Sequence, residues 1–170
     1  MTDLLDLVAL SLLPPWCGIL IAERLRSGES AGAALRALVR HHWRDEPDKL
    51  ATVHARAAAA ICRAEATGIT VVTWRDAAYP PALTTIADPP PVLWVRGQVS
   101  SLSLPSVAIV GARAGSPYAL SVAERLAHDL STAGLTIVSG LARGVDSAAH
   151  RGALAARACT VASLSGSSRQ

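Results

Sequence analysis

The stretch from Val107 to Ala158 alternates between short β-branched runs and amphipathic helical segments, and this alternation limits the possible fold more than any other feature. VAIVGARAGSPYALS predicts a strand over 107–110, a glycine turn, and a helix over 117–133. LTIVSG, LARG and VDSAAHRGALAARA repeat the order of strand, turn and helix, and CTVASLSG begins a further strand. Strands that alternate with helices through short loops form right-handed crossovers and a parallel sheet. The sequence therefore predicts an α/β fold.

The helix expected over 117–133 carries apolar residues at helical spacing and ends at Gly134. The chain has material for a core, because 51% of its residues are hydrophobic and only 17% are charged. We expect one face of this helix to be apolar and to pack inside, namely the face of Ala119, Val122, Ala123, Leu126, Leu130 and Ala133.

The first part of the chain carries helical signals only. Pro14-Pro15 separates a first short helix from a second, and Gly68 stops the longest segment, EPDKLATVHARAAAAICRAEATG. ITVVTW and VLWVRG then supply two short strands around a proline-rich connector. We therefore expect a helical domain over 1–66 and a sheet domain over 67–170. The chain stops where a doubly wound sheet continues, so we expect the second domain to be incomplete at its C-terminal end.

An uncharged stretch from Leu7 to Ala22 resembles a signal sequence in composition. Asp3 and Asp6 precede it where a signal carries positive charge, and it is shorter than a membrane span. We therefore expect a cytoplasmic protein without a membrane partner. The three cysteines are far apart in the sequence, so they suggest neither a disulfide framework nor a thiolate metal site.

The first glycine turn has features of an anion site. Gly111 and Gly115 flank Arg113, and Ser116 with the following proline begins the next helix as N-cap and first position. Backbone N–H groups and the helix dipole favour an anion at such a place. The spacing matches neither the dinucleotide fingerprint nor the Walker A loop. Two glycines that simply make a tight turn are an equally good interpretation.

The second turn strengthens the anion hypothesis, because the carboxyl ends of neighbouring parallel strands meet at one edge of the sheet. We expect Arg113 and Arg143 to lie near each other there, together with Ser139, Gly140 and Gly144. The net charge of +3 does not by itself indicate nucleic acid. However, 15 of the 16 basic residues are arginine, whose planar guanidinium binds phosphate oxygens bidentately.

Other residues near these turns have structural interpretations beside the functional ones. Asp146 is expected to cap the helix after the second turn, and His150 to be a core or hydrogen-bonded histidine. Arg151 extends the basic patch or faces water. Tyr118 is placed to stack on a base, and a packing role is about equally plausible. No Ser–His–Asp arrangement or pair of carboxylates indicates catalysis.

The run HHWRDE, from His41 to Glu46, is interpreted as the polar end of a helix and not as a metal site, because adjacent helical side chains point apart. We expect no metal and no cofactor. The four tryptophans are expected in the core, and they are Trp16, Trp43, Trp74 and Trp94.

Three segments resemble the DprA/Smf family of DNA-processing proteins. They are YPPALTTIADPPPVLWVRG (79–97), VAIVGARAGSPYALSVAERLAHDLSTAGLTIVSG (107–140) and LARGVDSAAHRGAL (141–154). The helical part is only loosely similar to the family's sterile-alpha-motif-like domain. After Ala158 the chain departs from the family pattern into a polar tail.

The resemblance implies a Rossmann-like domain that binds single-stranded DNA in place of a nucleotide cofactor. It implies a protein that is not an enzyme, that protects incoming DNA in natural transformation and helps to load RecA, and whose intact form is a possible homodimer. The family's turn arginine matches Arg113. The family's second-turn signature matches Ser139, Gly140, Ala142, Gly144, Asp146 and His150.

Two other functions stay open from the sequence. The first is a nucleoside-phosphate hydrolase of a related Rossmann group, although the chain lacks that group's Pro-Gly-Gly-x-Gly-Thr-x-x-Glu stretch. The second is an inactive truncated remnant, because a parallel sheet without its outer strands exposes unpaired edges. A nicotinamide oxidoreductase is a weaker alternative, since the glycine fingerprint is absent.

Overall fold

The chain divides into two compact units, Met1–Val99 and Ser100–Gln170. The computed structural model describes residues 2–164, so part of the polar tail expected after Ala158 lies outside the described residues. The expected boundary between 66 and 67 falls inside the first unit. The reason is that the first two strands pack on the helices that precede them.

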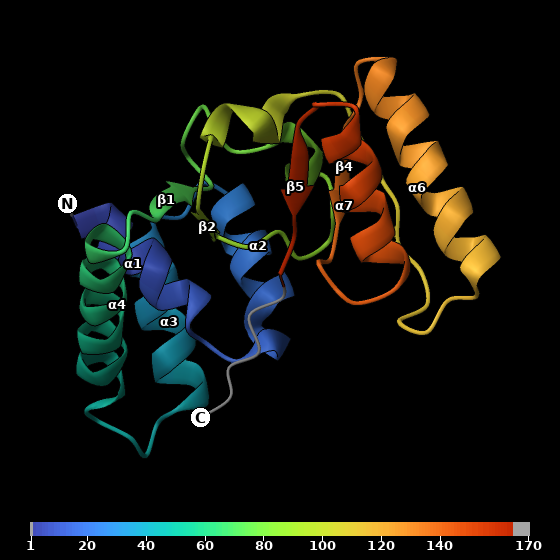
Figure 1. Ribbon diagram of the computed structural model, residues 1–170. Helices are drawn as coiled ribbons and strands as arrows, with labels where there is room; N and C mark the ends of the chain where they lie inside the picture. The colour runs from blue at the N-terminus through green and yellow to red at the C-terminus, as the bar shows by residue number, and fades with distance from the viewer. Residues whose placement is uncertain (1, 165–170) are drawn as a thin grey trace. The chain divides into compact units, whose positions relative to one another are not determined.

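The first unit begins with helices, as the sequence predicts. They are α1 (Thr2–Ser11), the short 3-10 helix η1 (Pro15–Cys17), α2 (Gly18–Arg26), α3 (Ala31–His42) and α4 (Lys49–Ala66) (Figure 1). Ser30 caps α3, because its hydroxyl oxygen accepts a hydrogen bond from the backbone N–H of Ala33 at 3.3 Å. Gly68 follows α4 with φ +66°, a left-handed conformation that glycine adopts without strain.

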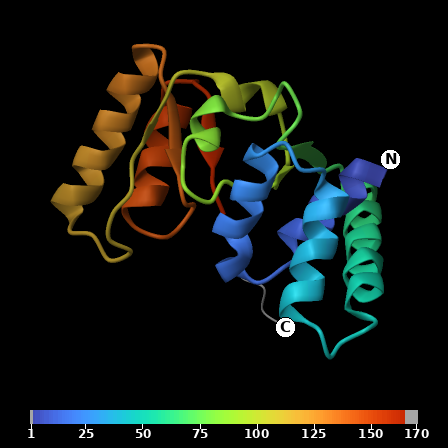
Figure 2. The same cartoon turned by 180° about the vertical axis from the view of Figure 1, so that it is seen from behind.

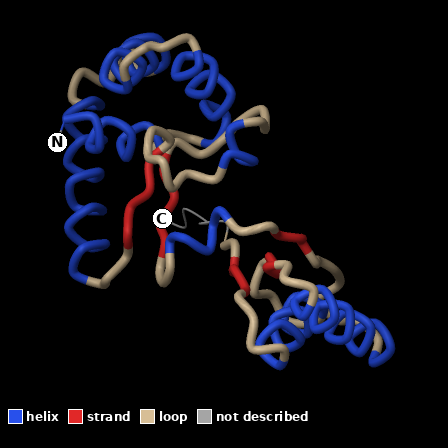
Figure 3. Tube along the Cα trace, turned by 90° about the horizontal axis from the view of Figure 1, so that it is seen from above, coloured by secondary structure: helices blue, strands red, loops and turns tan. Residues whose placement is uncertain are grey.

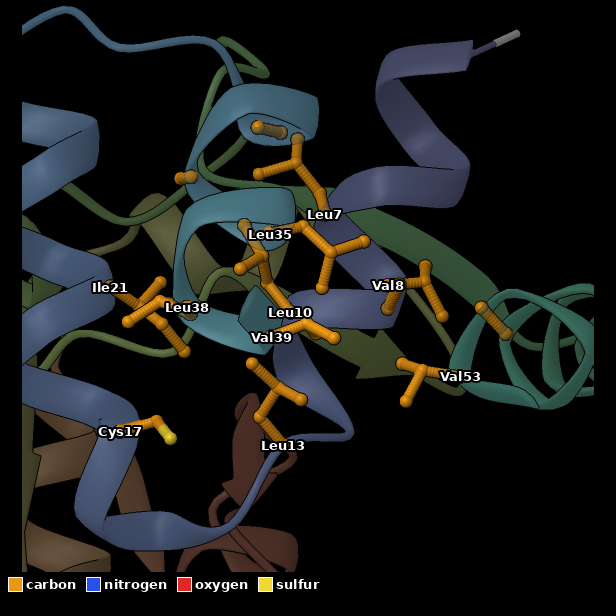
Figure 4. Packing of buried hydrophobic residues seen from close by; sticks show 14 of the residues in the cluster. Leu7, Val8, Leu10, Leu13, Cys17, Ile21, Leu35, Leu38, Val39 and Val53 are labelled. Carbon is orange, nitrogen blue, oxygen red and sulfur yellow. The ribbon is translucent and has the colours of Figure 1, made fainter. Parts of the chain in front are cut away.

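The core of this unit forms where α1, α2, α3 and α4 face one another (Figure 4). Leu7, Leu10 and Leu35 are almost fully buried there, and the uncharged stretch from Leu7 to Ala22 contributes several of the other buried side chains. No single helix within residues 2–164 is long and apolar enough to cross a membrane. In this part of the chain one pair of helices, Asp3–Ser11 and Pro15–Arg26, reaches the length and composition of a membrane span together, but the pair is bent by 120°.

Strands β1 (Thr70–Thr73) and β2 (Val92–Val95) pair antiparallel in a sheet of their own (Figure 3). They therefore do not join the parallel sheet of the domain in which the sequence places them. The connector between them contains a short helix, α5 (Pro81–Thr84), and is tied by Tyr79, whose hydroxyl donates to the Pro90 carbonyl at 2.8 Å. Burial raises the pKa of Tyr79 to about 12, so this hydroxyl keeps its proton.

The second unit has the predicted order of strands and helices. Its elements are η2 (Val99–Ser103), β3 (Ser106–Ala108), α6 (Pro117–Thr132), β4 (Thr136–Ser139), α7 (Val145–Ala155) and β5 (Thr160–Ala162). The strands are parallel in the order β3-β4-β5. Both crossovers move in the same direction along the sheet, so α6 and α7 cover the same face (Figure 1, Figure 2). The predicted α/β class is confirmed.

The buried face of α6 is the expected one only in part: Ala123 is buried and Leu130 packs against the core, as predicted. Val122 and Leu126 are exposed by 45% and 48%, whereas small residues of α6 are buried, namely Ala123, Ala127 and Ser131. The cause is the close approach of α7. A Cβ on Gly152 of this helix would overlap with the Glu124 carbonyl oxygen of α6. Only small side chains fit between two backbones at that distance, so α6 turns these residues inward.

Candidate functional site

The two glycine turns lie against each other at the carboxyl ends of β3 and β4. The backbone N–H of Val145 donates to the Ala112 carbonyl at 3.2 Å. A Cβ on Gly144 would overlap with this same carbonyl oxygen and would lie 2.6 Å from the carbonyl oxygen of Arg113. Since Arg143 immediately precedes Gly144, the backbones of Arg113 and Arg143 are neighbours, as the strand order predicts.

Glycine is needed in these turns for more than a change of direction. Gly144 has φ +88° and ψ −131°, a conformation that side chains with a Cβ rarely adopt. A Cβ on Gly111 would lie 2.9 Å from the Val145 side chain. The interpretation that the glycines only make tight turns is therefore incomplete, because they also allow the two turns to touch.

Asp146 does not cap α7, contrary to the expectation. The N-cap is Gly144, and no side chain within residues 2–164 caps the helix. The buried carboxylate of Asp146 instead accepts hydrogen bonds from the backbone N–H groups of Gly140 at 3.1 Å and Gly111 at 3.4 Å. One carboxylate thus ties the ends of two strands together. Its negative charge repels phosphate, so its place in the site is that of a positioning residue.

Two serines of the site also use their hydroxyl groups inside the protein. Ser139 is buried and donates to the Ile109 carbonyl at 2.6 Å, which links β4 to the end of β3. Ser116 caps α6 by accepting from the Ala119 N–H at 3.2 Å. With the Val145 N–H also donated to the first turn, the helix N-termini are partly satisfied already. The two helix N-termini therefore offer fewer free N–H groups to an anion than the sequence suggests.

His150 is buried one turn after Asp146 and is hydrogen-bonded, as the sequence predicts. The Thr160 hydroxyl donates to the Ile137 carbonyl at 2.8 Å, so we assign the Nδ1–H of His150 as the donor to that hydroxyl, also at 2.8 Å. Its Nε2 has no hydrogen-bond partner among the described residues. Burial lowers the pKa of His150, and the nearby carboxylate of Asp146 raises it by a smaller amount.

We expect acid to destabilise the second unit through His150. In the unfolded chain a histidine titrates near pH 6.5, and the folded protein binds this proton only at lower pH. The contribution of neutral His150 to the free energy of unfolding is therefore fully present above about pH 6.5. It is lost as the pH drops below that value. The measurement is the urea midpoint between about pH 7.5 and pH 5.5. His150→Asn should flatten this dependence, and parallel pH profiles of the two proteins would contradict the assignment.

Basic and apolar side chains face solvent around the two turns. Arg113 and Arg143 are exposed, and neither guanidinium has a hydrogen bond or an ion pair within residues 2–164. Tyr118 is 79% exposed at the start of α6, so its ring does not pack into the core formed by residues 2–164. Arg151, by contrast, is occupied by an ion pair with Glu124 at 3.1 Å.

Sequence reasoning missed two exposed apolar residues at this edge. Val110 follows β3 and is 71% exposed, and Leu141 follows β4 and is 56% exposed with φ 58°. One sequence signal could have identified them: each is an apolar residue directly beside a turn glycine, at a position where the preceding strand has already ended. Such side chains offer contact area for the flat faces of bases next to the two guanidinium groups. Together these groups can bind a flexible polyanion that carries rings.

No group of three or more His, Cys, Asp or Glu side chains within residues 2–164 is arranged to hold a metal ion. The rings of His41 and His42 contact each other with centroids 4.5 Å apart, so these adjacent side chains do not point apart as expected. The helix α3 does end at His42, as the run HHWRDE predicts.

Comparison with known proteins gives consistent relationships. Residues 70–170 match the family described as DNA recombination-mediator protein A. The match includes the segment after Ala158, which the sequence pattern sets apart from the DprA/Smf family. Protein Smf of Escherichia coli is 41% identical over 86 residues, which are 51% of this chain and 23% of that protein. DNA processing protein DprA of Streptococcus pneumoniae is 43% identical over 79 residues, 46% of this chain and 28% of that protein.

The fold is similar to the X-ray structure of DprA from Streptococcus pneumoniae. The two structures superpose with a TM-score of 0.59 and 33% sequence identity, over 69% of this chain and 41% of that chain. The chain therefore spans about a quarter of the length of the curated relatives named above and under half of the solved structure.

Proposed function

Because the chain belongs to the DNA recombination-mediator protein A family, we propose that it binds single-stranded DNA at the two glycine turns of its parallel sheet. The observation that carries the proposal is the pair of exposed guanidinium groups, Arg113 and Arg143, on turns that touch each other beside the exposed ring of Tyr118. Arginine forks bind phosphates, and an exposed ring stacks on an unpaired base.

The site acts by binding and not by catalysis. The carboxylate closest to the turns belongs to Asp146, which is engaged by two backbone N–H groups. The buried imidazole of His150 is committed to Thr160. In the cell, we propose that the protein works in the cytoplasm, protects incoming DNA during natural transformation, and helps to load RecA onto it. RecA and a second copy of the protein are its proposed protein partners.

The test is the affinity of the full chain for a labelled single-stranded oligonucleotide, measured by fluorescence anisotropy at several salt concentrations. The two phosphate contacts at this site alone predict that log K falls by at least about 1.4 for each tenfold rise in salt. A duplex of the same sequence should compete poorly, because its bases are not free to stack.

Size-exclusion chromatography and circular dichroism on the same preparation establish that the tested protein is folded. Affinity that does not depend on salt, or equal competition by duplex DNA, would overturn the proposal. Release of a free base from a nucleoside monophosphate would support the hydrolase alternative in its place.

A further inference from the structure

A second group of basic side chains lies in the first unit, around the end of α3. A hollow of about 480 Å³ is lined there by Arg24, Ala37, Arg40, His41 and Arg44. The guanidinium of Arg24 is bound to Glu29 at 2.9 Å. The side chains of Arg40 and Arg44 are exposed and make no ion pair within residues 2–164, so they supply the free positive charge of the hollow.

An aromatic stack continues this surface. The rings of Trp16 and Trp43 stack with centroids 5.6 Å apart and an interplanar angle of 23°. The His42 ring meets Trp16 edge-on at 4.8 Å and contacts the ring of His41, which lines the hollow. Trp16 is 55% exposed and Trp94 is 40% exposed, so neither is the core residue that the sequence predicts. An exposed indole that another ring holds in place is a platform for a flat ligand.

Acidic residues in the loop before α4 moderate the charge of this region. Glu46 is occupied by Lys49 at 3.0 Å, and the Lys49 ammonium lies 5.1 Å from the Trp43 ring. Asp45 and Asp48 are exposed, and neither of them lines the hollow. A surface with limited net charge and an exposed ring fits a ligand that offers bases as well as phosphates. This combination favours a single strand over a duplex or an anionic membrane.

We propose that this surface is a second contact for single-stranded nucleic acid. The ring of Trp16 stacks on an unpaired base, and the guanidinium groups of Arg40 and Arg44 bind the phosphates beside that base. The inference takes its class of ligand from the proposed function, but none of its residues. It also gives a role to the run HHWRDE, which has no part in the site at the glycine turns.

The first experiment is photocrosslinking of the full chain to a single-stranded oligonucleotide that contains iodouracil. A base stacked on an indole forms an adduct at that ring, and mass spectrometry of the digested protein identifies the peptide. We expect adducts on the peptide that contains Trp16. A tryptophan adduct confined to Trp94, which is 40% exposed on β2, would contradict the proposal.

The second experiment measures affinity after the combined change Trp16→Ala, Arg40→Ala and Arg44→Ala. Loss of one stacked base and two phosphate contacts should weaken binding about 100-fold or more. The matched control changes the same residue types elsewhere in the first unit, as Trp94→Ala with Arg56→Ala and Arg63→Ala. The control should bind like the parent protein, and circular dichroism checks that both variants fold.

The same changes are also made in a protein that carries Arg113→Ala and Arg143→Ala, which separates the two sites. An unchanged affinity in both backgrounds overturns this inference and leaves the proposed function standing. If the combined variant at Trp16, Arg40 and Arg44 loses affinity but the double variant at Arg113 and Arg143 does not, this inference is supported and the site at the glycine turns is overturned. A chain that binds no single-stranded DNA overturns both.

Discussion

Replacement of Arg113 and Arg143 by alanine is expected to weaken single-stranded DNA binding about 30-fold, which corresponds to about 2 kcal/mol in total, or about 1 kcal/mol for each exposed charged contact. The loss should be the same for all DNA sequences, because phosphate contacts carry no sequence information. The slope of log K against the logarithm of the salt concentration should become less steep by about 1.4, because binding releases two counterions fewer. Fluorescence anisotropy over a salt series measures both quantities.

The matched control for this double variant is Arg125→Ala with Arg157→Asn, which removes the same charge from the same unit. Arg125 is an exposed residue of α6 whose ion pair with Asp129 is long, at 3.9 Å. Arg157 follows α7 and has φ 55°, a conformation that asparagine tolerates. The control protein should keep the parent's affinity. If both double variants lost affinity equally, the effect would come from net charge and the site at the turns would be wrong.

The fold of the second unit could be predicted from the sequence because its signals are local. Each strand, turn and helix over 107–158 is marked by its own residues, and parallel crossovers leave few arrangements. The pairing of β1 with β2 could not be predicted in the same way. Their sequences indicate strands, but the choice of sheet depends on packing against α1 and α4, which are distant in the chain. The expected boundary at residue 66 misses this contact.

The candidate site shows the same division between local and long-range information. The strand order alone predicts that Arg113 and Arg143 are neighbours. The hydrogen bonds of Asp146 to Gly111 and Gly140 were missed, because an aspartate at this spacing from a turn is also typical of an N-cap. The stacking of Trp16 on Trp43 was missed because the contact joins two residues that are distant in the sequence.

A substitution of Gly152 by alanine is expected to destabilise the second unit by about 3 kcal/mol, at the upper end of the range for overpacked cores. A Cβ at this position would overlap with the backbone carbonyl of Glu124 and would lie 2.9 Å from the Cβ of Ala127. Because the obstacle is backbone, a rotation of a side chain cannot relieve it. The helices α6 and α7 must move apart, and contacts along both helices weaken. Urea unfolding followed by circular dichroism gives the change in free energy.

Gly134→Ala separates this overlap from the general effect of adding a side chain to a glycine. Gly134 has φ +88°, and no atom of the part of the chain that the structure describes lies within 4 Å of the Cβ that alanine would add. Its substitution costs about 1 to 2 kcal/mol from backbone strain alone. If Gly152→Ala destabilised the protein no more than Gly134→Ala does, α6 and α7 would not be in backbone contact in solution. In that case the small residues Ala123 and Ala127 would have no reason to face inward, and Val122 and Leu126 would be free to form the buried face that the sequence predicts.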